Sequence, residues 1–470
     1  MKYIPTIGLE IHAELKTRTK MFCDSANNPD EERPNVNICP VCMAHPGTLP
    51  VINKKAVEHV LRVGKAVGGT IADFTEFDRK NYFYPDIPKG YQISQYKYPL
   101  VSGGKLAGVD ITRVHLEEDT ATSKHDKGDY SLVDYNRAGV PLMELVTEPV
   151  IHDAETAVWF AKELQLLLRY LGVSDANMEK GEMRVEANIS ISLKSNVESQ
   201  KLGTKVEVKN LNSFKVVGKA IEYEIARQIK ALETGEKLVQ ETRGWDENRG
   251  ATFSQRKKES SDDYRYFPDP DLPKLRISEI AKFQDITLPE LPRQKRERYA
   301  RDYGIKAEDI ESYVTDEKLG VFFELIAMSL KEKDLVVLAS NYITSDLLGM
   351  RSAGTDIFAY ITAEQFVALI SMAGAGEISS RAAKDILGIL VEKGGDPREI
   401  ARREGLFQKS DEGELKAIAE KIIAENEKVV TEYKAGKEAS LQFLVGQVMK
   451  ETRGSANPQV AAKLLKEVLS

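Results

Sequence analysis

Three segments of the chain alternate apolar and polar residues with a period of two, and this pattern restricts the fold more than any other feature. They run from Tyr3 to Leu15, from Glu182 to Ser192 and from Thr204 to Asn210. A half-buried strand of an antiparallel sheet shows this alternation, because successive side chains point to opposite faces. The sequence therefore predicts a sheet with one apolar face and one polar face.

The polar sides of these segments combine acidic and basic groups: Glu10 with His12, Arg184 with Glu186, and Lys205 with Glu207 and Lys209. If the strands are neighbours, their polar faces form a floor of carboxylates fringed by cations. Such a surface suits Mg²⁺, which prefers oxygen ligands and substrate phosphates. The cations would balance the negative charge of a phosphoryl group during its transfer. Alternation alone also fits the solvated face of an ordinary sheet, and by itself it favours that simpler interpretation.

Two further segments bring acids into apolar surroundings. The run RVHLEED at 113–119 ends in three consecutive acids, and the alternation does not settle which of them turns inward. The run PLMELVTE at 141–148 places Glu144 between apolar neighbours. A buried carboxylate is costly without a partner. Glu144 is therefore either part of a buried ion pair or bound to a metal.

Two segments interleave cations with aromatic residues, namely 79–84 (RKNYFY) and 262–267 (DDYRYF). Such a combination can clamp a nucleotide base or the end of a tRNA. It also occurs in plain cores whose Lys and Arg side chains reach the surface, and the pattern by itself favours that alternative.

Several sequence motifs of nucleotide enzymes are absent. The chain has no G-x-x-x-x-G-K-[ST] loop, no dinucleotide-binding fingerprint and no kinase motif set. If the protein uses ATP, strand side chains must hold the phosphates. No cysteine has a convincing glutaminase context either, so ammonia would have to come from another chain.

Three cysteines, Cys23, Cys39 and Cys42, lie close together in the sequence. An odd number in one short segment argues against a disulfide framework and agrees with a reducing compartment. Cys39 and Cys42 have the C-x-x-C spacing of a zinc knuckle, but Ser25 stands where a fourth thiolate is expected. A structural zinc site normally has four ligands, so the segment favours an empty site. The candidate substitutes for the missing ligand are Asp24 and His45.

The composition is that of a globular protein that acts in the cytoplasm. Of the 470 residues, 42% are hydrophobic and 30% are charged, and no apolar run approaches the length of a membrane span or a signal peptide. The net charge of −7 argues against a protein that coats nucleic acid indiscriminately, although a local basic patch for one RNA remains possible.

Turn-forming segments divide the chain into three expected domains. The run LPELP at 288–292 breaks regular structure, and a weaker joint lies near 405–413. We expect an α+β fold with a mainly antiparallel sheet over 1–292, a helical domain over 293–408 and a small helical tail over 409–470. Within the first domain, apolar periodicity predicts helices over 53–67, 153–171 and 216–233.

Seven motifs resemble the B subunit of the aspartyl/glutamyl-tRNA(Asn/Gln) amidotransferase. They are long and follow the order of that family from about residue 3 to the end of the chain: IGLEIHAEL at 7–15, DRKNYFYPDIPKGYQISQY at 78–96, VHLEED at 114–119, YNRAGVPLMELVTEP at 135–149, KVEVKNLNSF at 205–214, SSDDYRYFPDPDLP at 260–273 and FLVGQVMKETRGSANP at 443–458.

The resemblance implies a fold and a reaction. The first domain would be a cradle similar to that of glutamine synthetase, using ATP and Mg²⁺ to phosphorylate the side-chain carboxylate of Glu or Asp mis-attached to tRNA. A glutaminase A subunit would supply ammonia to displace the phosphate, a small C subunit would hold the heterotrimer together, and the tail would grip the tRNA. Some relatives hold zinc between four cysteines.

The resemblance also assigns site residues by motif. The expected acid and histidine positions of the cradle are Glu10, His12, Glu118, Glu144, Glu186 and Glu207, of which Glu10, His12, Glu118 and Glu207 would bind Mg²⁺. The expected positions for nucleotide phosphates are Arg184, Lys205, Lys209 and, more weakly, Lys80. Two alternatives are an ATP-dependent ammonia ligase acting on a small amino acid and a non-catalytic tRNA-binding subunit.

Overall fold

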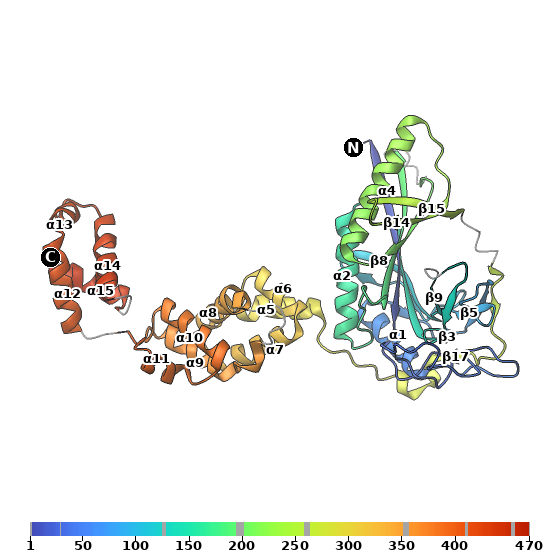
Figure 1. Cartoon of the computed structure of the whole chain (residues 1–470), viewed down its shortest axis with the longest axis horizontal. Helices are drawn as coiled ribbons and strands as arrows, with labels where there is room; N and C mark the ends of the chain where they lie inside the picture. Colours follow the sequence, from blue (N-terminus) through green and yellow to red (C-terminus); the bar gives the residue numbers. More distant parts are fainter. Residues whose placement is uncertain are drawn as a thin grey trace. The chain divides into compact units, whose positions relative to one another are not determined.

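The computed structural model describes residues 2–28, 30–124, 128–193, 202–257, 264–350, 357–408, 412–452 and 456–469. Its internal contacts divide the chain into two units, Met1–Pro292 and Arg293–Ser470. The first unit contains the strands and the second is helical (Figure 1). The chain is thus a mixed α+β protein, as its alternating segments predict.

The first unit is built on one large twisted sheet. Within the described residues it has ten strands, and every neighbouring pair is antiparallel except the parallel pair β13–β14. In spatial order the strands are β15 (Ala251–Lys257), β14 (Glu241–Asp246), β13 (Val206–Leu211), β12 (Met183–Leu193), β1 (Tyr3–Glu14), β11 (Pro141–Thr147), β8 (Val109–Glu118), β6 (Val101–Ser102) and β2 (Thr70–Ile71), with β7 (Lys105–Leu106) paired to β8.

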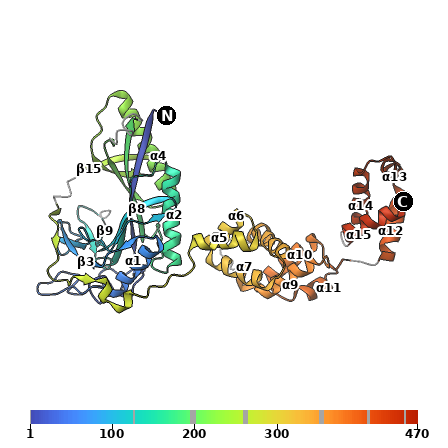
Figure 2. The same cartoon turned by 180° about the vertical axis from the view of Figure 1, so that it is seen from behind.

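Helices cover the apolar face of this sheet. They are α1 (Lys54–Ala66), α2 (Ala154–Tyr170) and α4 (Phe214–Thr234), and α2 and α4 run along the same face in both views (Figures 1 and 2). Ile7, Leu9 and Ile11 of β1 are completely buried in the core that these helices share with the sheet. The three helices predicted from periodicity are therefore confirmed, and the opposite face of the sheet is left to its polar residues.

Local sequence determines where these helices begin. Asp153 precedes α2, and its carboxylate accepts a hydrogen bond from the Thr156 amide at 2.7 Å. Ser213 caps α4 and Asn53 caps α1 in the same way. These side chains satisfy amides that have no partner inside the helix.

Short strands build smaller sheets beside the main one. The three-stranded sheet has the order β16 (Phe267–Pro268), β4 (Asp78–Asn81) and β5 (Tyr91–Ser94). The two-stranded sheets are β9 (Thr122–Lys124) with β10 (Leu132–Asp134) and β3 (Phe74–Thr75) with β17 (Leu275–Arg276), followed by the turns η2 (Ile277–Glu279) and η3 (Ala281–Phe283).

The second unit consists of helices. The first group is α5 (Pro292–Tyr303), α6 (Ala307–Thr315), α7 (Glu317–Ser329), α8 (Lys333–Asn341), the π-helical segment η4 (Tyr342–Leu347), the 3₁₀ turns η5 (Leu348–Met350) and η6 (Ile357–Ala359), α9 (Ala363–Gly374), α10 (Ser380–Lys393) and α11 (Pro397–Arg403). The second group is α12 (Glu412–Glu425), α13 (Glu427–Lys434), α14 (Ala439–Glu451) and α15 (Pro458–Leu469). No helix within the described ranges combines the length and apolar character that crossing a membrane requires.

Candidate active site

Strand register brings the predicted polar residues together on the open face of the sheet. His12 of β1 lies opposite Glu144 of β11 on one side and Arg184 of β12 on the other. Glu10 lies opposite Glu186, and the next strand places Glu207 opposite Asn188. Directly opposed residues of an antiparallel pair point to the same face. The side chains therefore converge although their segments are far apart in the sequence.

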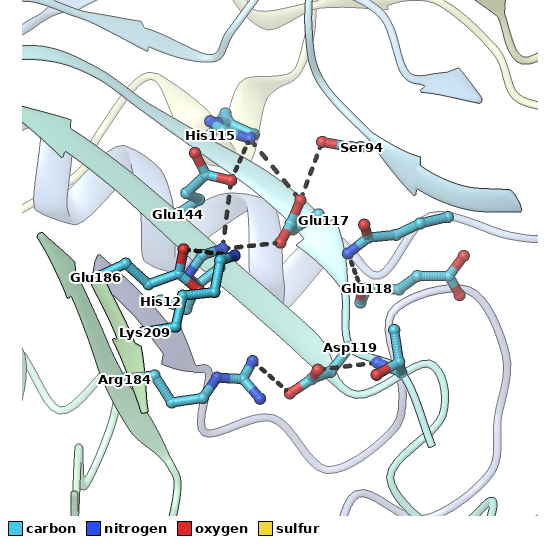
Figure 3. Close-up of polar contacts among 12 residues, drawn as sticks. His12, Ser94, His115, Glu117, Glu118, Asp119, Glu144, Arg184, Glu186 and Lys209 are labelled. Carbon is cyan, nitrogen blue, oxygen red and sulfur yellow. Dashed lines mark hydrogen bonds and ion pairs between the residues drawn. The ribbon is translucent and has the colours of Figure 1, made fainter. Parts of the chain in front are cut away.

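The first cluster consists of His12, Glu117 and Glu144 (Figure 3). The Nε2 atom of His12 lies 3.4 Å from Glu117 Oε1 and 3.4 Å from Glu144 Oε2. Ser94 donates a hydrogen bond to the second oxygen of Glu117 at 3.2 Å. One nitrogen and two carboxylates within reach of one point can hold a divalent ion.

The ionisation states of the side chains in this cluster depend strongly on one another. Burial alone would lower the pKa of His12, but hydrogen bonds and the charges of Glu117 and Glu144 outweigh burial and raise that pKa to about 10. Burial alone would likewise raise the pKa of Glu117, yet the hydrogen bond with His12 brings it below its usual value. Without a metal ion, His12 is therefore an imidazolium between two carboxylates.

The second cluster consists of Glu10, Glu186 and Glu207, whose carboxylate oxygens come within 4.8 Å of one another. Lys209 Nζ lies 2.8 Å from Glu186 Oε2 and 3.8 Å from Glu207 Oε1. This lysine offsets part of the repulsion between the three acids. A set of carboxylate oxygens is the donor type that Mg²⁺ prefers.

Neutral hydrogen-bond donors hold two acids of the second cluster in place. Asn188 Nδ2 donates to Glu10 Oε1 at 2.7 Å, and Thr242 Oγ1 donates to Glu207 Oε2 at 2.6 Å. Such supporting contacts fix the direction in which a ligand oxygen points.

Both clusters line one cleft of about 790 Å³. Cations stand around it: Arg184 donates to Asp119 at 3.0 Å, and Lys205 and Lys209 lie on the side of the second cluster. Lys80 reaches the cleft from β4, and Glu117 and nearby groups raise its pKa although burial alone would lower it. The four positions predicted to bind phosphates therefore line the same cleft as the two clusters.

Tyrosines form the wall of the cleft nearest to Lys80. Tyr96 and Tyr266 stack with ring centres 4.1 Å apart, and Tyr264 meets both Tyr82 and Tyr266 edge to face. The Lys80 ammonium lies 5.0 Å from the centre of the Tyr264 ring. The segments at 79–84 and 262–267 thus meet at this wall, with 262 and 263 outside the described residues.

Glu118 lies apart from both clusters, contrary to the motif-based expectation. It faces away from the cleft, where Lys89 Nζ lies 2.6 Å from Oε1 and the Ile93 amide donates to the same oxygen at 3.0 Å. Glu117 occupies the expected place, because β8 sets His115 opposite Glu144 and residues two apart share a face.

The sequence interpretation also missed His115 and Arg113 as cleft residues. His115 Nε2 lies 3.5 Å from Glu144 Oε2, and burial lowers its pKa despite the two nearby carboxylates. Residues 113, 115 and 117 are the polar half of an alternating strand, and that parity is the signal that would have identified them.

The three cysteines form a separate group. Their sulfur atoms come within 4.8 Å of one another. Within the described part of the chain, neither Asp24 nor His45 joins this group. The buried Lys20 ammonium lies 3.7 Å from Cys42 Sγ, as does the hydroxyl of Ser25. The sulfurs fit three corners of a tetrahedral zinc site, and the described residues supply no fourth side chain of the usual kind there.

The fold and the cleft together define the class of protein. The protein has an antiparallel sheet whose open face carries two groups of metal-ligating side chains, with cations and tyrosines around them, as expected for an enzyme that transfers a phosphoryl group.

Comparison with known proteins identifies the family within that class. Residues 5–282 match the model of the GatB/GatE catalytic domain, and residues 321–469 match a GatB domain. The B subunit of the aspartyl/glutamyl-tRNA(Asn/Gln) amidotransferase of Thermoanaerobacter pseudethanolicus is 46% identical over the full length of both chains. The corresponding proteins of Persephonella marina and Rippkaea orientalis, which have the same name, are 44% and 43% identical, covering 100% and 98% of those proteins. The chain belongs to the family of B subunits of this amidotransferase.

Proposed function

We propose that this chain uses ATP to activate the side-chain carboxylate of Glu attached to tRNA(Gln), or of Asp attached to tRNA(Asn), so that ammonia can amidate it. The observation that most supports this function is that two clusters of possible metal ligands and several cations share one open cleft on one sheet. Activation is chemically necessary, because a carboxylate has no useful leaving group for ammonia until it is phosphorylated.

Two Mg²⁺ sites fit the clusters. One would use His12, Glu117 and Glu144, and the other would use Glu10, Glu186 and Glu207. Bound Mg²⁺ would neutralise the triphosphate and the charge that develops during transfer. Binding at the first site must displace the proton from His12, so the affinity for metal rises with pH.

The reaction has two steps. A carboxylate oxygen attacks the γ-phosphorus of ATP, and the bond to the β,γ-bridging oxygen breaks, giving ADP and an acyl phosphate. Ammonia then attacks the acyl carbon, phosphate leaves with the C–O electron pair, and the nitrogen loses a proton to form the amide. Lys205, Lys209 and Arg184, which line the cleft, would hold the phosphates during the first step. Lys80 lies at the tyrosine wall, where the acyl group would enter.

The tyrosine wall supports an RNA end as the substrate. Terminal nucleotides of tRNA are unpaired, and proteins recognise such bases by stacking them on aromatic side chains. The wall lies in the same cleft as the first cluster. A bound terminal nucleotide would therefore bring its attached amino acid close to His12 and Glu144.

The relatives are each named as one subunit of an amidotransferase, which supports an enzyme of several chains. We propose a heterotrimer with a glutaminase A subunit as the ammonia source and a small C subunit, acting in the cytoplasm.

We further propose three functional domains: a glutamine synthetase-like cradle at 1–292, a helical domain at 293–408 and a tRNA-gripping tail at 409–470. The helices α12, α14 and α15 share a hydrophobic core of their own around Leu444 and Leu465, which supports the last division. Lys434, Lys437 and Lys450 are the tail residues to test first for tRNA contact, and Arg453 lies outside the described residues.

Zinc at the cysteines is a separate proposal. Cys23, Cys39 and Cys42 would supply three ligands, and an oxygen such as the Ser25 hydroxyl or a water would complete the set. Metal analysis of the purified protein before and after Cys39→Ser tests it. One zinc per chain that is lost in the variant is expected, and a metal-free wild type rejects it.

The proposed reaction is tested with Glu10→Gln and Glu207→Gln in the chain purified with its partner subunits. We expect ATP-dependent phosphorylation of the mischarged tRNA to fall by more than about 100-fold while tRNA affinity changes less than about twofold. The control Glu179→Gln alters an exposed acid outside the cleft and should behave as wild type.

The same assay separates the alternatives. Full activity in both cleft variants would indicate a non-catalytic tRNA-binding subunit. Equal turnover of free glutamate and mischarged tRNA by the wild type would indicate a small-molecule ligase.

A further inference from the structure

An arginine from the turn between β10 and β11 approaches the cleft without lining it. Arg137 Nε donates to Glu14 Oε1 at 3.0 Å, and Arg137 Nη2 donates to Asp119 Oδ2 at 2.6 Å. Asp119 lines the cleft, whereas Arg137 is not among the residues that do. Any part that Arg137 plays in the reaction must therefore pass through a neighbour.

Asp119 connects this arginine to Arg184 in the cleft. Arg184 Nη2 donates to the same oxygen, Asp119 Oδ2, at 3.0 Å (Figure 3). The other carboxylate oxygen, Oδ1, accepts a hydrogen bond from the Thr120 amide at 2.8 Å. A buried carboxylate is costly unless its oxygens are satisfied. Here the backbone holds one oxygen of Asp119, and two arginines hold the other.

The turn that carries Arg137 is anchored on both sides. Ahead of Arg137, the buried Lys20 ammonium donates to the backbone oxygen of Tyr135 at 3.1 Å. Behind it, the Gly139 amide donates to the backbone oxygen of Asp119 at 2.9 Å. A side chain on a fixed turn loses less conformational freedom on binding than one on an unanchored loop. The Arg137 guanidinium can therefore hold the Asp119 carboxylate in one direction.

The second arginine also changes the charge that Arg184 presents to the cleft. Two guanidinium groups share the single negative charge of Asp119. If Arg184 were the only partner, its charge and that of Asp119 would largely cancel at short range. Because Arg137 supplies a second positive charge to Asp119, Arg184 keeps more of its attraction for a phosphate group in the cleft.

We propose that Arg137 is a positioning residue for phosphoryl transfer, which sets the direction of the Arg184 guanidinium through Asp119. This inference rests on the proposed function, in which Arg184 would hold phosphates. An arginine binds phosphate through a planar fork of N–H groups, so its angle matters as well as its charge. A misplacement of about 1 Å can cost about 100-fold in rate.

The simpler alternative is an ion pair that only stabilises the fold, and the chain offers a matched example. Arg227 of α4 donates to the buried Glu224 at 2.6 Å, and neither residue lines the cleft. Loss of either arginine removes an ion-pair partner from a buried carboxylate and lowers stability. Stability therefore does not distinguish the two roles, but coupling to Arg184 does.

The test is a double-mutant cycle in the full chain purified with its partner subunits. The variants are Arg137→Gln, Arg184→Gln, their combination and the control Arg227→Gln. The measured quantity is the single-turnover rate constant for transfer of the γ-phosphate of ATP to mischarged tRNA. We expect Arg137→Gln and Arg184→Gln each to lose at least about 30-fold, and the double variant to be at most about threefold slower than Arg184→Gln. Arg227→Gln should keep the wild-type rate although its unfolding midpoint falls.

A double variant slowed by the product of the two single losses would overturn the inference, because Arg137 would then act independently of Arg184. A wild-type rate in Arg137→Gln or in Arg184→Gln would overturn it as well. If Arg137→Gln does not fold, Arg137→Lys takes its place in the same cycle, since lysine keeps the charge but cannot reach both acids with a planar fork. Failure of the proposed function is distinguishable, because the wild type would then transfer no phosphate to mischarged tRNA.

Discussion

Two neighbouring glutamates show how strictly the site depends on the direction of a side chain. Glu117 and Glu118 are adjacent near the end of β8, but one joins His12 in the cleft and the other pairs with Lys89 on the opposite side. Consecutive residues of a strand point to opposite faces, so only one of the two carboxylates can point into the cleft.

Substitution of the two glutamates separates their roles. Glu117→Gln keeps the size of the side chain but removes the charge, so we expect carboxylate phosphorylation to fall by more than about 100-fold with weaker Mg²⁺ activation. Glu118→Gln should change the phosphorylation step by less than about threefold, because its oxygens bind Lys89 and a backbone amide. Single-turnover phosphate transfer at varied Mg²⁺ measures both effects, and the reverse order would place Glu118 at the metal.

At the scale of elements, helix α1 is tied to the end of β1 through a buried histidine. His59 of α1 places Nε2 3.1 Å from the backbone oxygen of Lys16, which requires a ring with its proton on that nitrogen. Burial lowers the pKa of His59 to about 4. The ring that holds α1 against the sheet is therefore uncharged near neutral pH.

This depressed pKa predicts a pH-dependent stability. The unfolded chain takes up a proton at His59 near pH 6.5 and the folded chain only near 4, so stability is complete above 6.5 and falls as the pH drops toward 4. The loss would reach about 3 kcal/mol at 1.36 kcal/mol for each pH unit between these values. Denaturant unfolding of wild type and His59→Gln at pH 7 and pH 4.5 measures it. An equal decrease in both proteins would assign the effect to other groups.

Much of the fold could be predicted from periodicity, whereas the site could be predicted only in part. β1, β12 and β13 have one buried and one open face, so their alternation is clear. In β8, Arg113, His115 and Glu117 alternate with Val114 and Leu116, but Glu118 is an acid on the apolar side, so the sequence left open which glutamate faces the cleft. Residues Val114 through Glu118 are all buried, because β5 packs against that end of the strand. The assembly of the tyrosine wall could not be predicted from the sequence, because the wall joins segments that are distant in the sequence.

At the scale of the whole molecule, the chain carries an independent helical group beyond the sheet. The residues of α12 to α15 bury a core of their own, so removal of 409–470 should leave the first unit folded. We therefore predict that removing these helices weakens tRNA binding without abolishing nucleotide binding by the first unit.

Truncation after Gln408 tests that separation. We expect ATP binding to be retained within about twofold and the KM for mischarged tRNA to rise by more than about tenfold. Nucleotide binding by calorimetry and amidation at varied tRNA concentrations provide the two readouts. Unchanged KM would mean that the tail does not contact the tRNA.

Strand β1 also fixes the distance between the two clusters. β1 contributes one side chain to each cluster, Glu10 and His12, and two residues of a strand span about 6.6 Å. No side-chain substitution can alter that interval. A one-residue insertion between them would turn one ligand into the core, so natural variation along this stretch should consist of replacements and never of insertions or deletions.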